Sequence, residues 1–469
     1  MEQRELPRVM IAATGSGSGK TTITCGLLQA FLNRGKKLAS FKCGPDYIDP
    51  MFHSEVLGIK SRNLDLFFTE ENMANYLLSK NTGDCDLALI EGVMGYYDGL
   101  AGRSTECSSY DLARKTETPV ILVVDCKGMS VSILALIKGF LEFRQDSNLK
   151  GVILNRMSPI LYPDMKELIE GELDIKVLGY VPVMKDCQIE SRHLGLVTAK
   201  EIGNLKEILN RLAKQMEISI DLDQIFGIAK EATPIKYEMT EDLELLKIRG
   251  QNREDKTPVR IAVAMDKAFC FYYQDNLDLL QELGAEILPF SPIDDDTLPV
   301  GIHGLILGGG YPELYLKELS KNKNMLGEIR DAIIAGIPCV AECGGFMYLQ
   351  EGLQDKNGTL YEMVGVIEGE SFPTEKLTRF GYISLVAKED NVLGKKGMKL
   401  KGHEFHYWDS TNTGEGFHAE KPLLKTKWDC VIVRGNLWAG YPHIHFYSNL
   451  EVAIEFLRNC QLRKANNEV

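Results

Sequence analysis

Apolar runs alternate with longer mixed stretches through the first half of the chain. The runs are nearly continuous, and several end in polar or acidic residues: Val9–Ala13, Leu38–Lys42, Leu87–Gly92, Val120–Asp125 and Gly151–Asn155. Such runs are typical of strands buried on both faces of a parallel sheet. The segments between them favour helices, the first from about Lys20 to Arg34. The pattern therefore predicts βαβ units and a mainly parallel sheet.

The polar and charged stretch at residues 237–257 interrupts this pattern, and a second α/β series follows it. Predicted strands of the second series are Val259–Ala264, Glu286–Phe290, Gly304–Leu307, Cys339–Ala341, Tyr382–Val386 and Asp429–Val433, with a helix at Asn276–Leu283. A chain of 469 residues is also too long for one ordinary core. We therefore predict an α/β domain at 1–236, a linker at 237–257 and a second α/β domain at 258–469.

Composition narrows the class of protein. The chain is 44% hydrophobic and 25% charged, which is typical of a globular protein, and its net charge of −13 argues against a nucleic-acid surface. No run approaches the roughly 18 apolar residues of a membrane span, and the N-terminus lacks a signal-peptide core. The eleven cysteines include no CxxC pair and fit a reducing cytosol. We expect a cytoplasmic protein without nucleic-acid or membrane partners.

A glycine-rich segment between the first strand and the first helix has the composition of a phosphate-binding loop. Its residues are Thr14, Gly15, Ser16, Gly17, Ser18, Gly19, Lys20, Thr21 and Thr22. Backbone N–H groups of such a loop bind phosphate, Lys20 would reach the β- and γ-phosphates of ATP, and the Thr21 hydroxyl would help to hold Mg²⁺. Thr14 stands where the general pattern has glycine. The alternative is a Gly/Ser-rich turn with a helix-capping serine.

Four carboxylates follow the ends of two predicted strands. Asp46 and Asp49 come after the second strand, and Glu91 and Asp98 lie at the end of the third and after it. Ligands of open α/β sheets bind outside the carboxyl ends of the strands, and carboxylate oxygens there suit Mg²⁺. Taken singly, Asp46 and Asp98 are also ordinary turn residues. As a group, the four carboxylates predict a metal or substrate site.

Cys343 lies between a predicted strand and a run of glycines in the second domain. A cysteine on such a strand-to-helix turn is exposed and close to a helix N-terminus, which favours the thiolate. The N–H of Gly344 and an N–H of Gly309 or Gly310 could form an oxyanion hole. The alternative is a buried structural cysteine.

A nucleophilic cysteine needs a base, and the sequence offers two pairs of histidines. His443 and His445 alternate along a predicted strand and share a face, so spacing alone does not choose between them. His403 and His406 are the other candidates, although a histidine in such a segment is more often a local hydrogen-bonding residue.

Several longer motifs resemble the cobyrinate a,c-diamide synthase family (CobB/CbiA) of corrinoid biosynthesis, over nearly the whole chain. They are Phe41–Pro50 (FKCGPDYIDP), Ser191–Leu196 (SRHLGL), Asp266–Asn276 (DKAFCFYYQDN), Phe290–Pro292 (FSP), Gly309–Glu313 (GGYPE) and Gly402–Tyr407 (GHEFHY). The resemblance implies an N-terminal domain like dethiobiotin synthetase and a C-terminal class I, triad-type glutamine amidotransferase domain. It matches Cys343 to the glutaminase nucleophile, His443 to its base and Asn155 to an adenine-reading residue. His445 stands where other triad enzymes have glutamate.

The chemistry that this resemblance implies is amidation of the a and c carboxylates of cobyrinic acid in cobalamin biosynthesis. ATP with Mg²⁺ would form an acyl phosphate, and ammonia released from L-glutamine would displace the phosphate. We assign Thr21, Asp46 and Glu91 to the metal. The substrate or acyl-phosphate region takes Lys42, Tyr47, Asp49, Asp98 and Arg192. A homodimer is compatible with the sequence but not predicted by it.

Three alternatives remain at this point. The same reaction could act on Ni-sirohydrochlorin or hydrogenobyrinic acid, because substrate choice depends on pocket details. Cobyric acid synthase shares both domain types, but characteristically has Phe-Lys-x-Gln-Asn-Met where this chain has Gly-Pro-Asp-Tyr-Ile-Asp after Cys43. A ParA/MinD-type ATPase switch is a different class; such proteins carry a signature lysine at the position of Gly15 and lack a glutaminase half.

Overall fold

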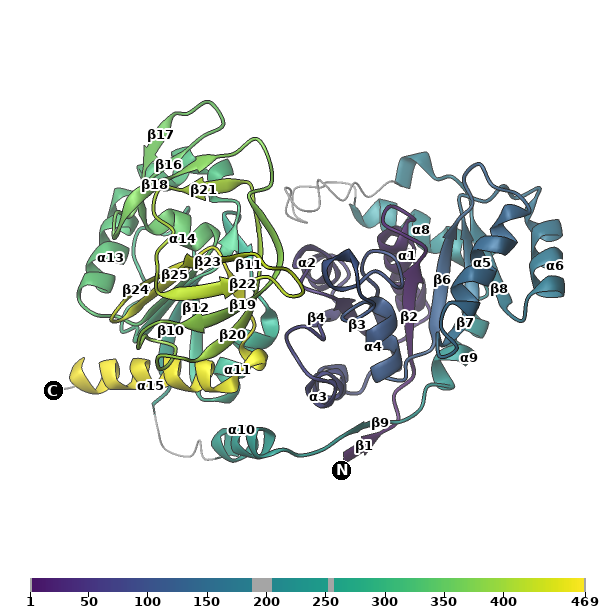
Figure 1. The fold of residues 1–469 in the computed structure, drawn as a ribbon, viewed down its shortest axis with the longest axis horizontal. Helices are drawn as coiled ribbons and strands as arrows, with labels where there is room; N and C mark the ends of the chain where they lie inside the picture. The colour runs from purple at the N-terminus through teal and green to yellow at the C-terminus, as the bar shows by residue number, and fades with distance from the viewer. Residues whose placement is uncertain (1, 188–204, 252–256, 468–469) are drawn as a thin grey trace. The chain divides into compact units, whose positions relative to one another are not determined.

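The computed structural model describes residues 2–187, 205–251 and 257–467 (Figure 1). The chain divides into two compact units, Met1–Glu238 and Met239–Val469. The stretch predicted as a linker, 237–257, contains the end of strand β9 (Ile235–Tyr237) in the first unit and helix α10 (Glu241–Gln251) in the second.

The first unit is built on a parallel sheet, which has seven strands among the described residues, in the order β4-β3-β5-β2-β6-β7-β8. The strands are β2 (Arg8–Ala13), β3 (Leu38–Cys43), β4 (Lys60–Leu64), β5 (Leu87–Glu91), β6 (Val120–Asp125), β7 (Leu149–Asn155) and β8 (Lys176–Val181). Strand β2 lies inside the sheet with every residue buried. Its carboxyl end, which leads into the glycine loop, therefore lies between the ends of β5 and β6.

Helices cover this sheet. They are α1 (Lys20–Asn33), α2 (Ile48–Glu55), α3 (Glu71–Thr82), α4 (Ser109–Lys115), α5 (Ser132–Glu142), α6 (Tyr162–Glu172), α8 (Leu205–Ser219) and α9 (Leu222–Lys230). Apolar side chains of α1, α8 and α9 form one core cluster with those of the central strands. A short antiparallel pair, β1 (Glu2–Arg4) with β9, and two 3-10 turns (Leu100–Gly102 and Lys185–Cys187) complete the unit.

The second unit contains a six-stranded sheet in its described part, in the order β12-β10-β13-β15-β25-β24, parallel except for the β24–β25 pair. The strands are β10 (Val259–Ala264), β12 (Ala285–Phe290), β13 (Gly304–Leu307), β15 (Cys339–Glu342), β24 (Ile432–Arg434) and β25 (Leu437–Gly440). Its helices are α10, α11 (Gln274–Glu282), α12 (Leu316–Lys321), α13 (Lys323–Ile334), α14 (Gly344–Leu349) and α15 (Leu450–Asn467), with 3-10 turns at Pro312–Leu314 and Phe446–Ser448. Apolar residues of α13 and α14 belong to its core.

Smaller sheets flank this sheet. One has the order β17-β16-β18-β21, one the order β23-β22-β19-β20-β26, and one pairs β11 with β14. Their bounds are β11 (Phe269–Phe271), β14 (Gly309–Gly310), β16 (Gln350–Gln354), β17 (Leu360–Glu362), β18 (Ile367–Pro373), β19 (Arg379–Ala387), β20 (Lys399–His406), β21 (Trp408–Ser410), β22 (Phe417–Glu420), β23 (Lys427–Cys430) and β26 (His443–Ile444). Strand β26 pairs with β20, which ties the C-terminal histidines to the GHEFHY segment.

The predicted fold class, α/β in both halves with a mainly parallel sheet in the first, is confirmed. One predicted strand is wrong: Asp429–Val433 is not a single strand. Val431 adopts a left-handed conformation with φ of 69°. The chain turns there, so that β23 and β24 enter different sheets.

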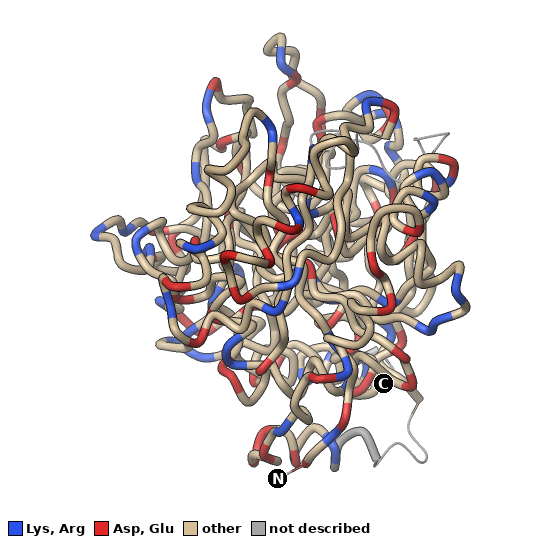
Figure 2. The backbone as a smooth tube through the Cα atoms, turned by 90° about the vertical axis from the view of Figure 1, so that its right-hand side faces the viewer, with Lys and Arg blue, Asp and Glu red and all other residues tan. Residues whose placement is uncertain are grey.

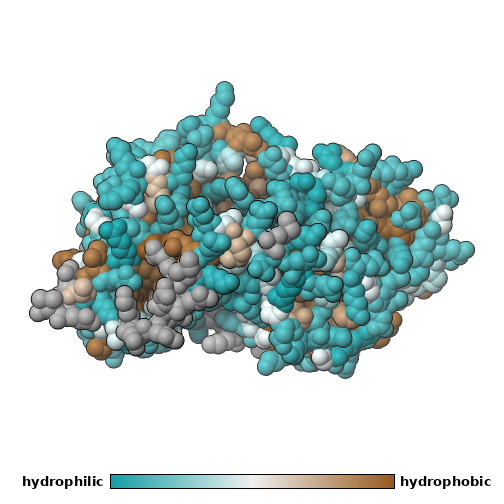
Figure 3. Space-filling model, turned by 90° about the horizontal axis from the view of Figure 1, so that it is seen from below, coloured by the Kyte–Doolittle hydropathy of each residue, from teal (hydrophilic) through white to brown (hydrophobic). Residues whose placement is uncertain are grey.

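The surfaces carry mixed charge and scattered apolar residues. Figure 2 shows Lys and Arg interspersed with Asp and Glu along the backbone. The face in Figure 3 is mostly hydrophilic with separate hydrophobic areas. Among the described residues, no helix combines the length and apolar character that crossing a bilayer requires.

Candidate active sites

The glycine loop of the first unit joins the buried end of β2 to the start of α1. Gly17 and Gly19 have φ of 76° and 91°, conformations that glycine adopts without strain. A Cβ on Gly19 would also lie 2.3 Å from the Asn155 amide nitrogen. The loop thus has the strand–loop–helix geometry in which backbone N–H groups and the helix dipole bind phosphate.

Lys20 begins α1, is buried, and donates hydrogen bonds to the carbonyls of Gly15, at 3.3 Å, and Met94. Burial, together with the charge of Lys42, lowers the pKa of Lys20 to about 8. Carbonyl groups hold this amino group, but no carboxylate forms a direct ion pair with it among the described residues. Phosphate oxygens are the anionic partners that this position suits.

Two consecutive side chains at the end of β7 hold the glycine loop. The Asn155 amide donates to the Ser18 carbonyl at 2.8 Å, and the Arg156 guanidinium donates to the Gly17 carbonyl at 3.1 Å. Arg156 has φ of 58° and forms a bidentate ion pair with Asp125 at the end of β6, with an Nε–Oδ1 distance of 2.6 Å. The predicted nucleotide residue Asn155 therefore contacts the loop itself.

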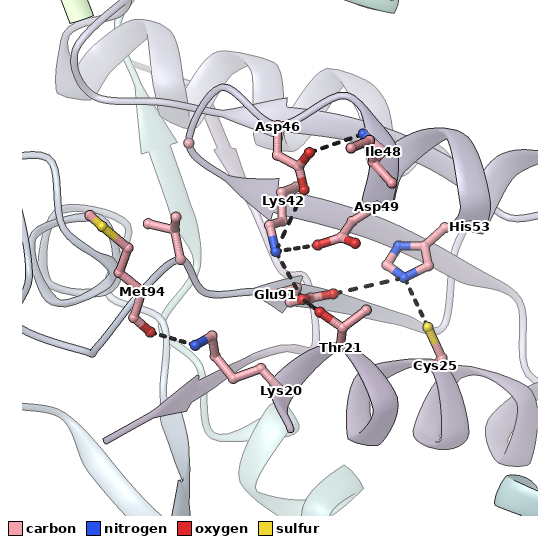
Figure 4. A network of polar contacts seen from close by, with 12 residues as sticks. Lys20, Thr21, Cys25, Lys42, Asp46, Ile48, Asp49, His53, Glu91 and Met94 are labelled. Carbon is pink, nitrogen blue, oxygen red and sulfur yellow. Dashed lines mark hydrogen bonds and ion pairs between the residues drawn. The ribbon is translucent and has the colours of Figure 1, made fainter. Parts of the chain in front are cut away.

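The register of the sheet brings Lys42 and Glu91 together, because the two are paired across β3 and β5. Figure 4 shows the Lys42 amino group among the Asp46, Asp49 and Glu91 carboxylates. Lys42 donates to Glu91 Oε1 at 2.8 Å and to Asp49, and lies 4.0 Å from Asp46 Oδ2. The Thr21 hydroxyl donates to the same Glu91 oxygen at 2.6 Å. The structure thus brings four of the predicted residues together with Thr21.

The charges of this cluster are unevenly compensated. Burial and the nearby Asp49 charge raise the pKa of Glu91 and of Asp46 to about 7 each. Burial alone would raise the pKa of Asp49 as well, but the Lys42 ammonium outweighs it and lowers that pKa to about 2. One lysine therefore holds one carboxylate fully ionised and leaves the other two short of positive charge.

His53 on α2 extends the network inward, and no sequence motif pointed to it. Its Nδ1 lies 2.8 Å from the Ser40 hydroxyl, and its Nε2 lies 3.5 Å from Cys25 Sγ and 3.9 Å from Glu91 Oε2. Burial lowers the pKa of His53 to about 4, against the effect of Asp49. His53 is therefore neutral at physiological pH and adds no positive charge beside the Glu91 carboxylate.

The residues around Glu91 fit Mg²⁺ bound together with a nucleotide. The Glu91 Oε2 atom is buried without a hydrogen bond among the described residues, and the Thr21 hydroxyl adjoins its other oxygen. In the described part of the chain, no group of three or more His, Cys, Asp or Glu side chains could hold a metal alone. Mg²⁺ in nucleotide sites needs only one or two carboxylates, because water and phosphate supply the remaining oxygens.

The other predicted substrate residues lie at the edge of this cluster or outside the described residues. Asp98 is exposed and accepts a hydrogen bond from the Gly95 N–H at 2.9 Å, which shapes the loop after β5. Tyr47 is half-buried directly before α2. Arg192 lies outside the described residues.

Cys343 of the second unit connects β15 directly to α14. It has φ of 46°, a strained conformation for a residue other than glycine, and its N–H donates to the Gly440 carbonyl at 2.7 Å. This sharp turn is the backbone form that places a nucleophile at the end of a sheet, but the Cys343 side chain is buried, so the expectation of an exposed cysteine is wrong.

The glycines beside Cys343 are required by close packing. A Cβ on Gly309 would lie 2.3 Å from His443 Cε1, and a Cβ on Gly345 would lie 2.1 Å from the Leu307 carbonyl. A Cβ on Gly344 would lie 3.1 Å from the backbone nitrogen of Gly310. The predicted oxyanion residues Gly309, Gly310 and Gly344 are therefore neighbours around Cys343.

Of the predicted histidines, His443 contacts Cys343. Burial would lower the pKa of His443. Electrostatic attraction and a hydrogen bond to Cys343, followed by the same two interactions with Glu342, raise that pKa to about 10 instead. The distance from His443 Nδ1 to Glu342 Oε2 is 3.5 Å. Glu342 was not singled out in the sequence, where its place directly before Cys343 gave the available signal.

The other three histidines are buried and neutral. His445 packs on Tyr273 with ring centroids 5.0 Å apart, and burial lowers its pKa to about 3. His403 is paired with His443 across β20 and β26, and burial lowers its pKa to about 3. The ring of His406 stacks on Tyr441 at 3.8 Å.

Models of two protein families match this chain. Residues 9–197 match the CobQ/CobB/MinD/ParA nucleotide binding domain, and residues 260–450 match the CobB/CobQ-like glutamine amidotransferase domain. The two matches fall on the two units and include the glycine loop and Cys343 respectively.

Curated relatives match over almost the full length. A protein of Caldanaerobacter subterraneus subsp. tengcongensis, named cobyrinate a,c-diamide synthase, is 42% identical over 96% of this chain and 98% of its own. Proteins with the same name from Listeria innocua and Thermoplasma volcanium are 40% and 39% identical over 96% and 97% of this chain, and over 98% of their own lengths. Among solved structures, MinD of Aquifex aeolicus shows 18% identity and a TM-score of 0.30, covering 49% of this chain and 99% of its own.

Proposed function

The chain belongs to the cobyrinate a,c-diamide synthase family, and from this membership we propose that it converts the a and c carboxylates of cobyrinic acid to amides in cobalamin biosynthesis. It is a ligase with a nucleotide-binding domain and a glutamine amidotransferase domain. The observation that supports the proposal is that one chain holds two clusters of candidate catalytic residues, one around Lys20 and Lys42 and one around Cys343.

The first unit activates a carboxylate. A carboxylate oxygen attacks the γ-phosphorus of ATP, the bond to the β-phosphate oxygen breaks, and an acyl phosphate and ADP result. Lys20 binds the transferring phosphoryl group, and the glycine-loop N–H groups bind the phosphates. Thr21, Glu91 and Asp46 would hold Mg²⁺, which when bound neutralises charge on the phosphates. Lys42 and Asp49 orient the substrate carboxylate, and Asn155 and Arg156 hold the loop.

The second unit supplies ammonia. Cys343 Sγ attacks the side-chain amide carbon of glutamine, and the N–H groups of Gly310 and Gly344 stabilise the oxyanion. The C–N bond breaks, and His443 gives its proton to the departing ammonia. Water then hydrolyses the thioester to glutamate. In the first unit, ammonia attacks the acyl carbon and phosphate leaves, giving the amide.

The curated relatives bear on the alternative functions that the sequence left open. An ATPase switch leaves the second unit without a role, whereas the curated relatives span both units. The tetrapyrrole is the part of the proposal that rests on the relatives' names. Hydrogenobyrinic acid and Ni-sirohydrochlorin remain as competing substrates, and a direct comparison of the three decides between them.

The test is mass spectrometry of cobyrinic acid incubated with the protein, glutamine, ATP and Mg²⁺. Two carboxyl-to-amide conversions, absent without ATP, are the expected result. Glutaminase activity without conversion of cobyrinic acid, combined with conversion of Ni-sirohydrochlorin or hydrogenobyrinic acid, would reassign the substrate. Conversion of none of the three would contradict the proposed reaction.

A further inference from the structure

We propose that Glu342 is the third member of the glutaminase catalytic set, a positioning residue that holds His443 for proton transfer with Cys343. This inference rests on the proposed function of the second unit. Triad-type enzymes that the sequence resembles place a glutamate two residues after the histidine, where this chain has His445. The structure supplies the carboxylate from a different strand.

The pairing of β15 with β25 creates the contact. Glu342, the last residue of β15, is paired with Gly440, the last residue of β25. The chain then runs through Tyr441 and Pro442 into β26, which begins at His443. The neighbouring ends of β15 and β25 thus bring Glu342, which directly precedes Cys343 in the sequence, against His443. The two residues lie about a hundred positions apart in the chain.

The Glu342 carboxylate binds this segment at two points. Its Oε1 accepts the Ile444 N–H at 3.1 Å, which fixes the backbone of β26. Its Oε2 lies 3.5 Å from His443 Nδ1. That second distance is longer than an ordinary N–H···O bond, as is common for catalytic contacts before substrate binds. One carboxylate therefore fixes the position of both the β26 backbone and the His443 ring.

Glu342 lies within ion-pair distance of His443, and the buried Glu404 on β20 also acts on His443 through its charge. Among the described neighbours, Cys343 is the nucleophile, Gly309 closes one side of the ring, and His403 faces it across the strand pair as a neutral group. With Nδ1 directed at Glu342, Nε2 is the ring nitrogen available to the Cys343 thiol. His445 packs against Tyr273 and Tyr447 instead.

This arrangement assigns Glu342 a defined part in each proton transfer. When Cys343 attacks glutamine, His443 carries the proton that leaves with ammonia, and it takes a proton from water when the thioester is hydrolysed. Glu342 stabilises the imidazolium between these steps and keeps the Nδ1–H tautomer, so that Nε2 exchanges protons with the thiol and substrate.

Glu342→Gln tests this role with almost no change of shape. The Gln carbonyl can still accept the Ile444 N–H, but its NH₂ then faces His443 Nδ1. The ring proton is driven to Nε2, where it blocks proton transfer from Cys343. We expect kcat for glutamine hydrolysis to fall roughly 10³-fold with little change in KM. Ammonia-dependent amidation, which bypasses the glutaminase, should be retained.

A second readout distinguishes positioning from general structural damage. Iodoacetamide alkylation of Cys343, followed against pH, reports the thiolate, and in Glu342→Gln its midpoint should rise by about one pH unit because the imidazolium is less stable. Glu342→Asp keeps the charge and should recover at least tenfold in kcat over the Gln variant. The control is Glu328→Gln. Like Glu342, Glu328 accepts a hydrogen bond from a backbone N–H, that of Leu298, with an N–O distance of 2.7 Å, but it is not part of the Cys343 site.

The outcomes separate this inference from the proposed function. If Cys343→Ala abolishes glutamine use while Glu342→Gln stays within threefold of wild type with an unshifted alkylation midpoint, the role of Glu342 is refuted and the proposed function stands. If Cys343→Ala retains glutamine use, the proposed function fails. If Glu342→Gln also loses ammonia-dependent activity, the Glu342→Asp variant becomes the deciding measurement. Equal kcat for glutamine hydrolysis in the Asp and Gln variants would then contradict the inference.

Discussion

The two sites differ in how their charges are balanced in the protein alone. In the second unit, the thiol of Cys343, the imidazole of His443 and the carboxylate of Glu342 form a chain of matched partners. In the first unit, Lys42 lies among three carboxylates, and the pKa of both Asp46 and Glu91 is raised to about 7. The glutaminase is therefore assembled before substrate arrives, whereas the nucleotide site still lacks positive charge.

This difference follows from the chemistry of each site. A cysteine nucleophile needs its base and the positioning residue in place before glutamine binds. Phosphoryl transfer depends on positioning and charge neutralisation, part of which comes with the nucleotide and its cation. An excess of carboxylate around one lysine is what a cation-binding site has before the cation is bound.

The largest expected effect is loss of the buried lysine of the first unit. Lys42→Ala leaves Asp49 and Glu91 buried without their cation, and should lower the free energy of unfolding by about 3–5 kcal/mol. Denaturant unfolding of the first unit measures it. Lys37→Ala is the matched control, because Lys37 also pairs with an aspartate, Asp84, but on the surface.

The comparison with Lys37 decides the result for the buried cluster. Equal unfolding midpoints for the Lys42 and Lys37 variants would contradict the account of a charge-dependent cluster. The cost should also be larger at pH 8 than at pH 5.5, because the carboxylates can protonate at the lower pH.

An intermediate effect is expected at the glycine loop. Arg156→Ala removes the hydrogen bond to the Gly17 carbonyl and the ion pair with Asp125. A hydrogen bond from a charged group contributes roughly 1.5–3 kcal/mol, so the KM for ATP should rise about tenfold or more.

The glutaminase should keep its wild-type kcat in this variant, and Arg156→Lys should recover part of the ATP affinity. Arg34→Ala is the control, since Arg34 makes a bidentate contact with Glu217 on the surface of the same unit. An unchanged KM for ATP in Arg156→Ala would refute the role of this residue in holding the loop.

The smallest effect is a pH dependence of the second unit. The pKa of His443 is about 10 in the folded protein against an ordinary 6.5. Because the folded state holds this proton more tightly, the stabilisation is complete below about pH 6.5, declines above it and is lost beyond about pH 10. The Tm difference between wild type and His443→Asn should therefore shrink from pH 7 to pH 10.

The same measurement in a Cys343→Ala background is the control, because the thiol is the main group that raises this pKa. There the Tm difference should vary less with pH. An equal slope in both backgrounds would show that Cys343 does not set the protonation of His443.

The parts of the fold that follow local patterns were predicted from the sequence. Buried parallel strands such as β6 and β10 are continuous apolar runs with little ambiguity. The edge strand β4, with the sequence KSRNL, is too polar to be recognised in this way. The Asp429–Val433 prediction failed because a single backbone conformation at Val431 redirects the chain.

The candidate sites divide in the same way. Lys20 and Cys343 could be predicted because the residues next to them in the sequence form recognisable motifs. The contact between Lys42 and Glu91 depends on strand register, and the contact between Glu342 and His443 on the pairing of β15 with β25. Pairings between distant strands leave no local signal, so the contacts of Glu342, His53 and Arg156 were found only in the structure, although Glu342 stands directly before Cys343 in the sequence.

The central claim is that two separate sites in one chain make and use ammonia, and Cys343→Ala tests it most directly. Amide formation on cobyrinic acid with ATP and Mg²⁺ would be measured by mass spectrometry with either glutamine or ammonium chloride as the nitrogen source. The account predicts that the variant loses the glutamine-dependent reaction and keeps the ammonium-dependent one at the wild-type rate. Loss of both in a folded variant, or retention of the glutamine-dependent reaction, would contradict it.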